Sequence, residues 1–115
     1  MPQKLSASSV NERRSRERKV RAKLQKLLRE GQGFLGGTPM ERWKKCGRES
    51  CKCTMGEKHF GVYLVRRVKG NLRQAYIPAD WNDDVHQWVT NYRLMRELLD
   101  ELSDIWWENV REKEL

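Results

Sequence analysis

The residues with the most distinctive chemistry in this chain of 115 residues lie between positions 46 and 59. This stretch contains all three cysteines and one of the two histidines, in the spacing Cys46-x4-Cys51-x-Cys53-x5-His59. Three thiolates and one imidazole at such short separations can converge on a single tetrahedral ion. The pattern therefore predicts a metal site formed by these four residues.

A set of four protein ligands is typical of structural zinc, because a catalytic zinc keeps one coordination position open for water or substrate. We therefore expect Zn²⁺ in a zinc knuckle with a folding role. An iron–sulfur cluster is one alternative, since soft thiolates also select it. A reduced, metal-free loop is the other. A disulfide framework is disfavoured, because the number of cysteines is odd and we see no secretory signal.

The charge of the chain changes sign along the sequence. Residues 1–30 and residues 31–79 each carry ten Lys or Arg against three acids, a net charge of +7. Residues 80–115 carry four against ten, a net charge of −6. This polarity indicates an anionic partner for the basic part, most often nucleic acid, whereas the acidic part faces elsewhere or pairs in part with the basic arm.

A basic helix is expected over residues 9–30. Ser9 and Glu12 fit a capping box, and Gly31 is placed to end the helix. The first half of this helix, residues 12–19, has no apolar face to bury, so we expect it to project into solvent or to lie along a polyanion. Arginine suits bidentate contact with phosphate, and a merely solvated charged helix is the alternative. The candidate nucleic-acid contacts here are Arg13, Arg14, Arg16, Arg18, Lys19 and Arg21.

A β-hairpin is expected after the cysteine segment. Two β-favouring runs, 60–67 and 72–77, flank a turn that contains Lys69 and Gly70. A basic two-stranded ribbon has the width of a DNA major groove. The alternative is an edge hairpin that its charges keep soluble. The candidate nucleic-acid contacts in this region, including those before the cysteines, are Lys44, Lys45, Arg66, Arg67, Lys69 and Arg73.

A long acidic amphipathic helix is expected over residues 80–112, with Asp80 and Asp83 at its start. Its apolar residues alternate steps of three and four, which is the pattern of a coiled-coil seam or of a helical-hairpin core. Val89, Leu98 and Ile105 widen this stripe. Because the helix is longer than a small hairpin can cover, we expect part of it to contact a protein partner or a second copy of the chain. The candidate interface residues are Trp88, Tyr92, Met95, Leu99, Leu102, Trp106 and Trp107.

These elements predict an α+β fold with an N-terminal helix, a zinc knuckle, a β-hairpin and a long C-terminal helix packed as a helical hairpin or a dimer. Residues 1–8 are expected to form a flexible tail, and residues 9–115 a single domain in which 38–78 hold the metal knuckle and the hairpin. No stretch approaches a membrane-spanning length, so we expect no membrane partner and a cytoplasmic location.

The sequence also resembles a family of small, basic, uncharacterised microbial proteins. The resemblance covers about residues 24–105. It is carried by Arg-Trp-Lys-Lys-Cys-Gly-x3-Cys-x-Cys over 42–53, Gly-Glu-x-His over 56–59, and Tyr76-Ile-Pro. Trp-x3-Tyr-Arg over 88–93 and Glu-Leu-Leu-x-Glu-Leu-Ser over 97–103 continue it. The resemblance implies a metal knuckle at the cysteine block and association with mobile elements or their hosts.

The sequence thus favours a small zinc-binding, nucleic-acid-binding protein, with DNA favoured over RNA, that acts as a regulator or accessory factor of a mobile element or phage. The alternative is a protein-interaction adaptor or inhibitor, such as an anti-defence protein, that docks on a larger nucleoprotein complex. We do not expect an enzyme, because no nucleophile, base and orienting group occur at a recognisable spacing.

Overall fold

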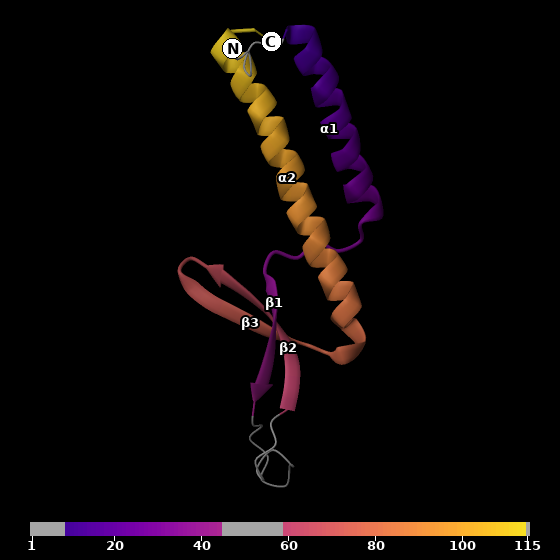
Figure 1. The fold of residues 1–115 in the computed structure, drawn as a ribbon, viewed down its shortest axis with the longest axis vertical. Helices are drawn as coiled ribbons and strands as arrows, with labels where there is room; N and C mark the ends of the chain where they lie inside the picture. Colours follow the sequence, from indigo (N-terminus) through magenta and orange to yellow (C-terminus); the bar gives the residue numbers. More distant parts are fainter. Residues whose placement is uncertain (1–8, 45–58, 115) are drawn as a thin grey trace, which may run out of the picture. The chain divides into compact units, whose positions relative to one another are not determined.

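The computed structural model describes residues 9–44 and 59–114. In chain order these form α1 (Val10–Glu30), β1 (Thr38–Lys44), β2 (His59–Val68), β3 (Asn71–Ile77), the short 3-10 helix η2 (Ala79–Trp81) and α2 (Asn82–Glu112) (Figure 1). The predicted α+β class is confirmed, with an N-terminal helix, antiparallel strands and a long C-terminal helix. The tail 1–8 and the cysteine segment lie outside the described residues.

The chain divides into two compact units. The helical unit consists of the residues up to Gln32 together with those from Asn91 onward, and the sheet unit consists of Gly33–Thr90. The helix α2 supplies residues to both units. The single domain expected over residues 9–115 stays a prediction.

Hydrogen bonds satisfy backbone groups at both ends of α1. At the start, the Glu12 backbone N–H donates to Ser9 Oγ at 3.1 Å, and the Ser9 backbone N–H donates to Glu12 Oε1 at 3.0 Å. This is the predicted capping box. At the other end, Gly31 is the C-cap, and its carbonyl oxygen accepts from Asn91 Nδ2 at 2.7 Å. Both ends therefore satisfy backbone groups that the helix itself leaves unpaired.

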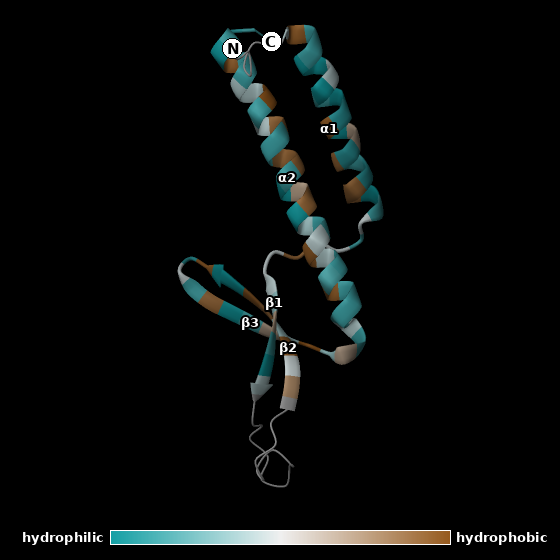
Figure 2. Cartoon of the chain, in the orientation of Figure 1, coloured by the Kyte–Doolittle hydropathy of each residue, from teal (hydrophilic) through white to brown (hydrophobic). Residues whose placement is uncertain are grey.

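The core of the helical unit lies between α1 and the second part of α2, which run antiparallel (Figure 1). Val20 and Leu24 of α1 pack with Leu98 and Ile105 of α2. Figure 2 shows the hydrophobic positions of both helices at intervals, separated by hydrophilic ones. This arrangement confirms the predicted antiparallel packing of the two helices, because each helix buries one apolar stripe.

The buried stripe of α2 includes two of the residues that were predicted to widen its apolar face. Leu98 and Ile105 are buried, whereas the predicted interface residues Leu99 and Trp106 are exposed. The stripe continues through a buried polar residue, Asn109. A buried amide is stable when it is hydrogen-bonded, and a search for apolar periodicity does not count it. The roles of Leu99 and Trp106 in a protein interface stay a prediction.

The sheet unit contains a three-stranded antiparallel sheet in the order β1-β2-β3. The predicted hairpin is confirmed as β2 and β3, and β1 pairs with the other edge of β2. One face of the sheet contributes Ile77, with Val62 and Leu64 beside it, to a core formed with Val85 and Val89 of α2. Alternation along the strands leaves the other face directed away from this core.

The second turn of α2 and the linker before β1 contact each other within the same unit. The Leu35 backbone N–H donates to the Trp88 carbonyl oxygen at 3.1 Å. Gly33 lies against the Trp88 ring, so that a Cβ there would be 2.6 Å from Cγ of the indole. Asp80, the predicted N-cap, lies in η2, and α2 begins two residues later. Neither α1 nor α2, the long helices of the described residues, has an apolar run suited to crossing a membrane.

Candidate nucleic-acid interface

The predicted metal ligands lie largely outside the described residues. Cys46, Cys51 and Cys53 fall in the segment 45–58, and His59 is the first residue of β2. The register of β1 and β2 makes Lys44 and His59 Cα partners, and the neighbouring rings of Trp43 and Phe60 are 4.9 Å apart between centroids. The described sheet therefore brings together the two chain ends from which the cysteine segment departs.

Within 9–44 and 59–114, no group of three or more His, Cys, Asp or Glu side chains is arranged to hold a metal ion. The metal prediction thus depends on residues of the cysteine segment, and it stays a prediction. Lys45 lies in the same segment, and of Lys44 the backbone alone is described.

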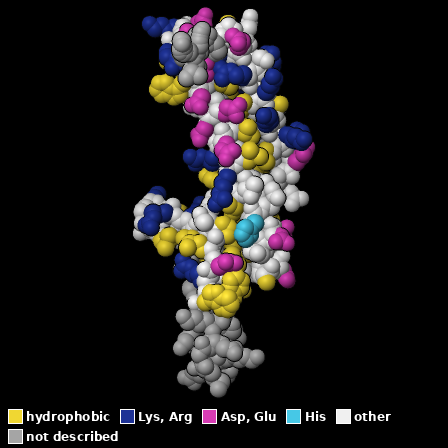
Figure 3. All heavy atoms as spheres, in the orientation of Figure 1, with side chains coloured by type: hydrophobic (Ala, Val, Ile, Leu, Met, Phe, Trp, Pro, Cys, Tyr) yellow, Lys and Arg dark blue, Asp and Glu magenta, His cyan; other side chains and the backbone are white. Residues whose placement is uncertain are grey.

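The end of the β2–β3 hairpin is the most basic surface of the described sheet. The register pairs Arg66 directly with Arg73, so their side chains leave the same face. Both are exposed, and a hollow of about 240 Å³ lies beside them. Figure 3 shows Lys and Arg side chains gathered at this hairpin end. The sequence from His59 to Ile77 contains no Asp or Glu that could neutralise them.

The turn of the hairpin adds a cation in an uncommon backbone conformation. Lys69 has φ of 50° and Gly70 has φ of 82°. Positive φ at both central residues is what a two-residue hairpin turn of type I′ requires, and Asn, Asp or Gly usually occupy these positions. Arg67 donates from Nη1 to the Gly70 carbonyl oxygen at 3.2 Å, which fixes its guanidinium at the turn. The predicted contacts Arg66, Arg67, Lys69 and Arg73 are therefore brought together.

Arg13 departs from the expectation that residues 12–19 project into solvent or lie along a polyanion, and this expectation is wrong for Arg13. Its side chain is 1% exposed. Its Nε donates to Asn109 Oδ1 at 2.7 Å, and its Nη2 is 2.8 Å from Glu114 Oε1. The guanidinium supplies several donors in one plane, so it is stable in this position when acceptors surround it. Arg13 holds α1 against the end of α2 and is not available to phosphate.

Arg16 also contacts the acidic helix. Its Nη2 donates to both carboxylate oxygens of Glu108 at 2.9 Å. This pair and the Arg13–Glu114 pair confirm the expectation that the acidic part pairs in part with the basic arm. Arg21 pairs with Glu17 on its own helix at 2.7 Å.

The other predicted contacts of α1 are on its exposed surface. Arg14, Arg18 and Arg21 are spaced by four and three residues, so they share one side of the helix. Lys19 is exposed as well. Two of the six predicted contacts of α1, Arg13 and Arg16, therefore pair with residues of α2, although Arg16 stays exposed, and the other four are exposed as well.

The predicted protein-interface residues of α2 have different environments. Met95 and Leu102 are half-buried against the core of the helical unit, and Trp88 packs against the core of the sheet unit. Tyr92 is half-buried, and its hydrogen bond with the side chain of Arg96 raises the pKa of that guanidinium. The exposed members are Leu99, Trp106 and Trp107.

The exposed tryptophans border a shallow hollow. Trp107 is 71% exposed, and it lines a space of about 230 Å³ with Ser103, Trp106 and Val110. Large apolar side chains grouped at a surface indicate an interaction site more often than single ones do. The last turns of α2 therefore retain an uncovered apolar surface.

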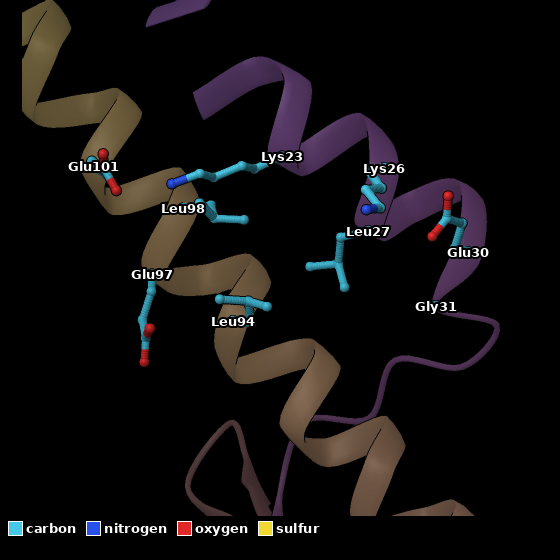
Figure 4. A pocket seen from close by; sticks show the side chains of 9 residues that line it. All are labelled: Lys23, Lys26, Leu27, Glu30, Gly31, Leu94, Glu97, Leu98 and Glu101. Carbon is cyan, nitrogen blue, oxygen red and sulfur yellow. The ribbon is translucent and has the colours of Figure 1, made fainter. Parts of the chain in front are cut away.

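A larger hollow of about 550 Å³ lies in the helical unit. Figure 4 shows Leu27, Leu94 and Leu98 between the helices, with Lys23 extending from α1 toward α2. The border of this hollow carries two lysines and three glutamates. Because these charges have mixed sign, the hollow does not favour an anionic ligand. Its lining residues are Lys23, Lys26, Leu27, Glu30, Gly31, Leu94, Glu97, Leu98 and Glu101.

Sequence reasoning missed a set of residues on the face of the sheet that is directed away from the core. Tyr63 and Tyr76 are Cα partners on β2 and β3, and Arg42 of β1 lies over the Tyr63 ring. The alternation of residues in the predicted strands could have placed Tyr63 and Tyr76 on one face. The position of Arg42 depends on the β1–β2 register, which the hairpin pattern does not contain.

Comparison with known proteins agrees with the resemblance noted in the sequence. A family described as a domain of unknown function, DUF6788, matches residues 11–87. No curated protein and no solved structure matches the chain. The match begins in the first turn of α1 and ends in the second turn of α2, so it includes the whole sheet. Since it spans more than half of the sequence, the chain belongs to the DUF6788 family.

Proposed function

We propose that this protein is a small zinc-containing, nucleic-acid-binding protein, with DNA as the favoured partner, which acts as a regulator or accessory factor of a mobile element or phage. The observation that carries the proposal is the cross-strand pair of Arg66 and Arg73 at a hairpin end without carboxylates. Like charges directly opposite each other destabilise an antiparallel pair. A phosphate placed between them removes this repulsion.

The hairpin end suits a polyanion more than it suits a single small anion. Arg67 and Lys69 extend the basic surface around the turn, and all four cations are exposed. Arginine contacts phosphate through two parallel hydrogen bonds, whereas lysine acts as a point charge. Several successive phosphates are therefore the ligand that this surface matches in charge.

The exposed side of α1 is a second candidate contact. Arg14, Arg18 and Arg21 follow one another along the helix and are accompanied by Lys19. Arg13 and Arg16 are left out of the proposal, because they hold α1 to α2. A test that substitutes all arginines of α1 together would therefore confuse loss of binding with loss of folding.

Zinc fits the ligands available at the cysteine segment. Cys46, Cys51, Cys53 and His59 would hold it, and they leave no open position for substrate. The strand register supports this site, because His59 is the Cα partner of Lys44 and Lys44 lies two residues before Cys46. Cα partners in an antiparallel ladder are about 4.5–5.5 Å apart, so His59 and the chain leading to Cys46 start from neighbouring positions. The ion would close the end of the β1–β2 pair.

The proposal is tested by measuring binding to labelled duplex DNA across a salt series. We expect log Kd to depend linearly on log salt, and we expect the double variant Arg66→Ala/Arg73→Ala to lower the slope by about 2, or roughly 0.9 per phosphate contact. The matched control is Arg93→Ala/Arg111→Ala, which removes the same charge from the exposed surface of the acidic helix. If both double variants lower the salt slope by the same amount, net charge alone determines binding.

A protein-interaction adaptor or inhibitor is the second candidate function. The specific observation in its favour is the group of exposed apolar side chains at the end of α2, with Trp107 the most exposed. Such a protein would dock on a larger nucleoprotein complex through this surface or form a homodimer. In that case Trp107→Ala abolishes the association while the hairpin variants do not, and a light-scattering mass reports whether the partner is a second copy.

A further inference from the structure

The face of the sheet opposite the core carries a row of ring and guanidinium groups that crosses all three strands. Tyr63 and Tyr76 contact edge to face, with centroids 5.6 Å apart and planes at 66°. The Arg42 guanidinium carbon is 6.0 Å from the Tyr63 centroid on the other side. We define Arg42, Tyr63 and Tyr76 as the tyrosine face.

A glycine makes room for this row. Gly61 is the Cα partner of Arg42 and shares its face of the sheet. A Cβ at Gly61 would lie 3.3 Å from Cε1 of Tyr76 and 3.4 Å from Cε1 of Tyr63. The distance to Tyr76 is tighter than ordinary van der Waals contact and the distance to Tyr63 is at its lower limit, so a larger residue at Gly61 would crowd the Tyr76 ring first. The absence of a side chain at Gly61 therefore lets the two tyrosines lean together.

The tyrosine face is open at Tyr76, whereas Val65 on the same face is buried. Tyr76 is 59% exposed, although a tyrosine on a sheet commonly packs against a neighbouring layer. Met40 and Leu72, which alternation places on the same face, are exposed as well. The core of the sheet unit lies against the opposite face, through Ile77 and its neighbours.

The charges of this face select the occupant. Arg67 shares the face and lies at the turn, and Arg42 lies at the other end. Glu41, the one acid in the three described strands, is the Cα partner of Val62 and belongs to the opposite face. Exposed aromatic rings flanked by arginines bind bases by stacking and phosphates by charge. Bases in a duplex are already stacked on their neighbours, so a free base must come from a single strand.

We propose that the tyrosine face binds single-stranded nucleic acid, with a base stacked on Tyr76 and the phosphates beside Arg42 and Arg67. This proposal rests on the nucleic-acid-binding function proposed above, and it adds the strandedness and the mode of contact. Stacking tolerates any base, so the proposal predicts little dependence on sequence.

The test uses the full chain and three labelled oligonucleotides of the same length: oligothymidylate, a duplex and an abasic backbone. We expect the wild-type protein to bind oligothymidylate more tightly than either of the other two. Tyr76→Ala should weaken binding to oligothymidylate by about 5- to 150-fold, the range for loss of one stacked base, and leave binding to the abasic strand unchanged. Tyr76→Phe keeps the ring and should bind as the wild type does.

Leu72→Ala is the matched control, because Leu72 is an exposed apolar residue on the same strand and face. Gly61→Ala is a second variant that keeps every ring and charge but crowds the two tyrosines, and we expect it to weaken oligothymidylate binding while circular dichroism stays that of the folded chain. Oligouridylate in place of oligothymidylate reports whether RNA is accepted equally.

The outcomes separate the two proposals. If Tyr76→Ala binds oligothymidylate like the wild type, or if the abasic strand or the duplex binds as tightly as oligothymidylate, the tyrosine face is not a base-stacking surface, and the charge-based function stands. If the wild-type chain binds none of the oligonucleotides at low salt, the proposed nucleic-acid function itself is refuted, and the tyrosine-face proposal with it.

Discussion

The hydrogen bond between Arg13 and Asn109 allows a quantitative test of how the helical unit is held together. Asn109→Leu replaces the amide by an apolar group of similar size and leaves Arg13 Nε buried without this acceptor. Hydrogen bonds to charged groups contribute about 1.5–3 kcal/mol, and complete loss of the partner of a buried charge costs about 3–5 kcal/mol. Because Arg13 keeps Glu114, we expect a loss of about 2–3 kcal/mol in the free energy of unfolding.

Two further variants define the origin of this loss. Glu114→Gln removes a charge from a side chain that is 52% exposed, so solvent screening should limit its effect to below about 1 kcal/mol. The double variant Arg13→Met/Asn109→Leu removes donor and acceptor together. Since no buried group is then left unpaired, its stability should return to within about 1 kcal/mol of the wild type.

The assay is denaturant unfolding followed by far-UV circular dichroism, which reports mainly on the two helices. Thermal unfolding should show the Asn109→Leu midpoint lower by roughly 8–15 °C. If Asn109→Leu loses no more stability than Glu114→Gln, or if the double variant is the least stable of the set, the buried hydrogen bond is not what holds α1 to the end of α2.

Three other predictions concern separate parts of the chain. The backbone hydrogen bond from Ser9 holds the pKa of Glu12 below its ordinary value of 4.5. The stabilisation of α1 by the Glu12 carboxylate is therefore present above pH 4.5 and is lost as the pH falls through the folded-state pKa. Glu12→Gln should remove this acid-dependent step in helix content. Gly33→Ala should destabilise the sheet unit and shift tryptophan fluorescence, because the new Cβ meets the Trp88 ring, and an unchanged spectrum would contradict this contact. Cys51→Ser should abolish bound zinc measured by elemental analysis, and a folded variant with unchanged metal content would exclude the zinc knuckle.

Local sequence signals were sufficient for most of the fold. The capping box at Ser9, the end of α1 at Gly31 and the turn at Lys69 and Gly70 each depend on neighbouring residues, and each was predicted correctly. The hairpin strands follow from a dense run of β-branched and aromatic residues. These features need no knowledge of distant contacts, so a single sequence contains them.

Tertiary partners determine the rest. Arg13 occurs in a run of charged residues, and its burial depends on Asn109, 96 residues further along the chain. The buried stripe of α2 includes Asn91 and Asn109 for the same reason, since both are buried through hydrogen bonds that periodicity does not register. Of the candidate site, the basic hairpin end was predictable from spacing, whereas the position of Arg42 beside Tyr63 required the pairing of β1 with β2.

The left-handed backbone at Lys69 has a consequence for how variants of this protein would emerge under selection. Asn or Gly adopts this conformation more readily, so either residue there would make the turn easier to form. A library enriched only for resistance to heat should therefore accumulate Asn or Gly at this position. The selected variants would lack the cation at the tip of the hairpin. We expect them to be more stable to heat than the wild type and to bind a polyanion less tightly.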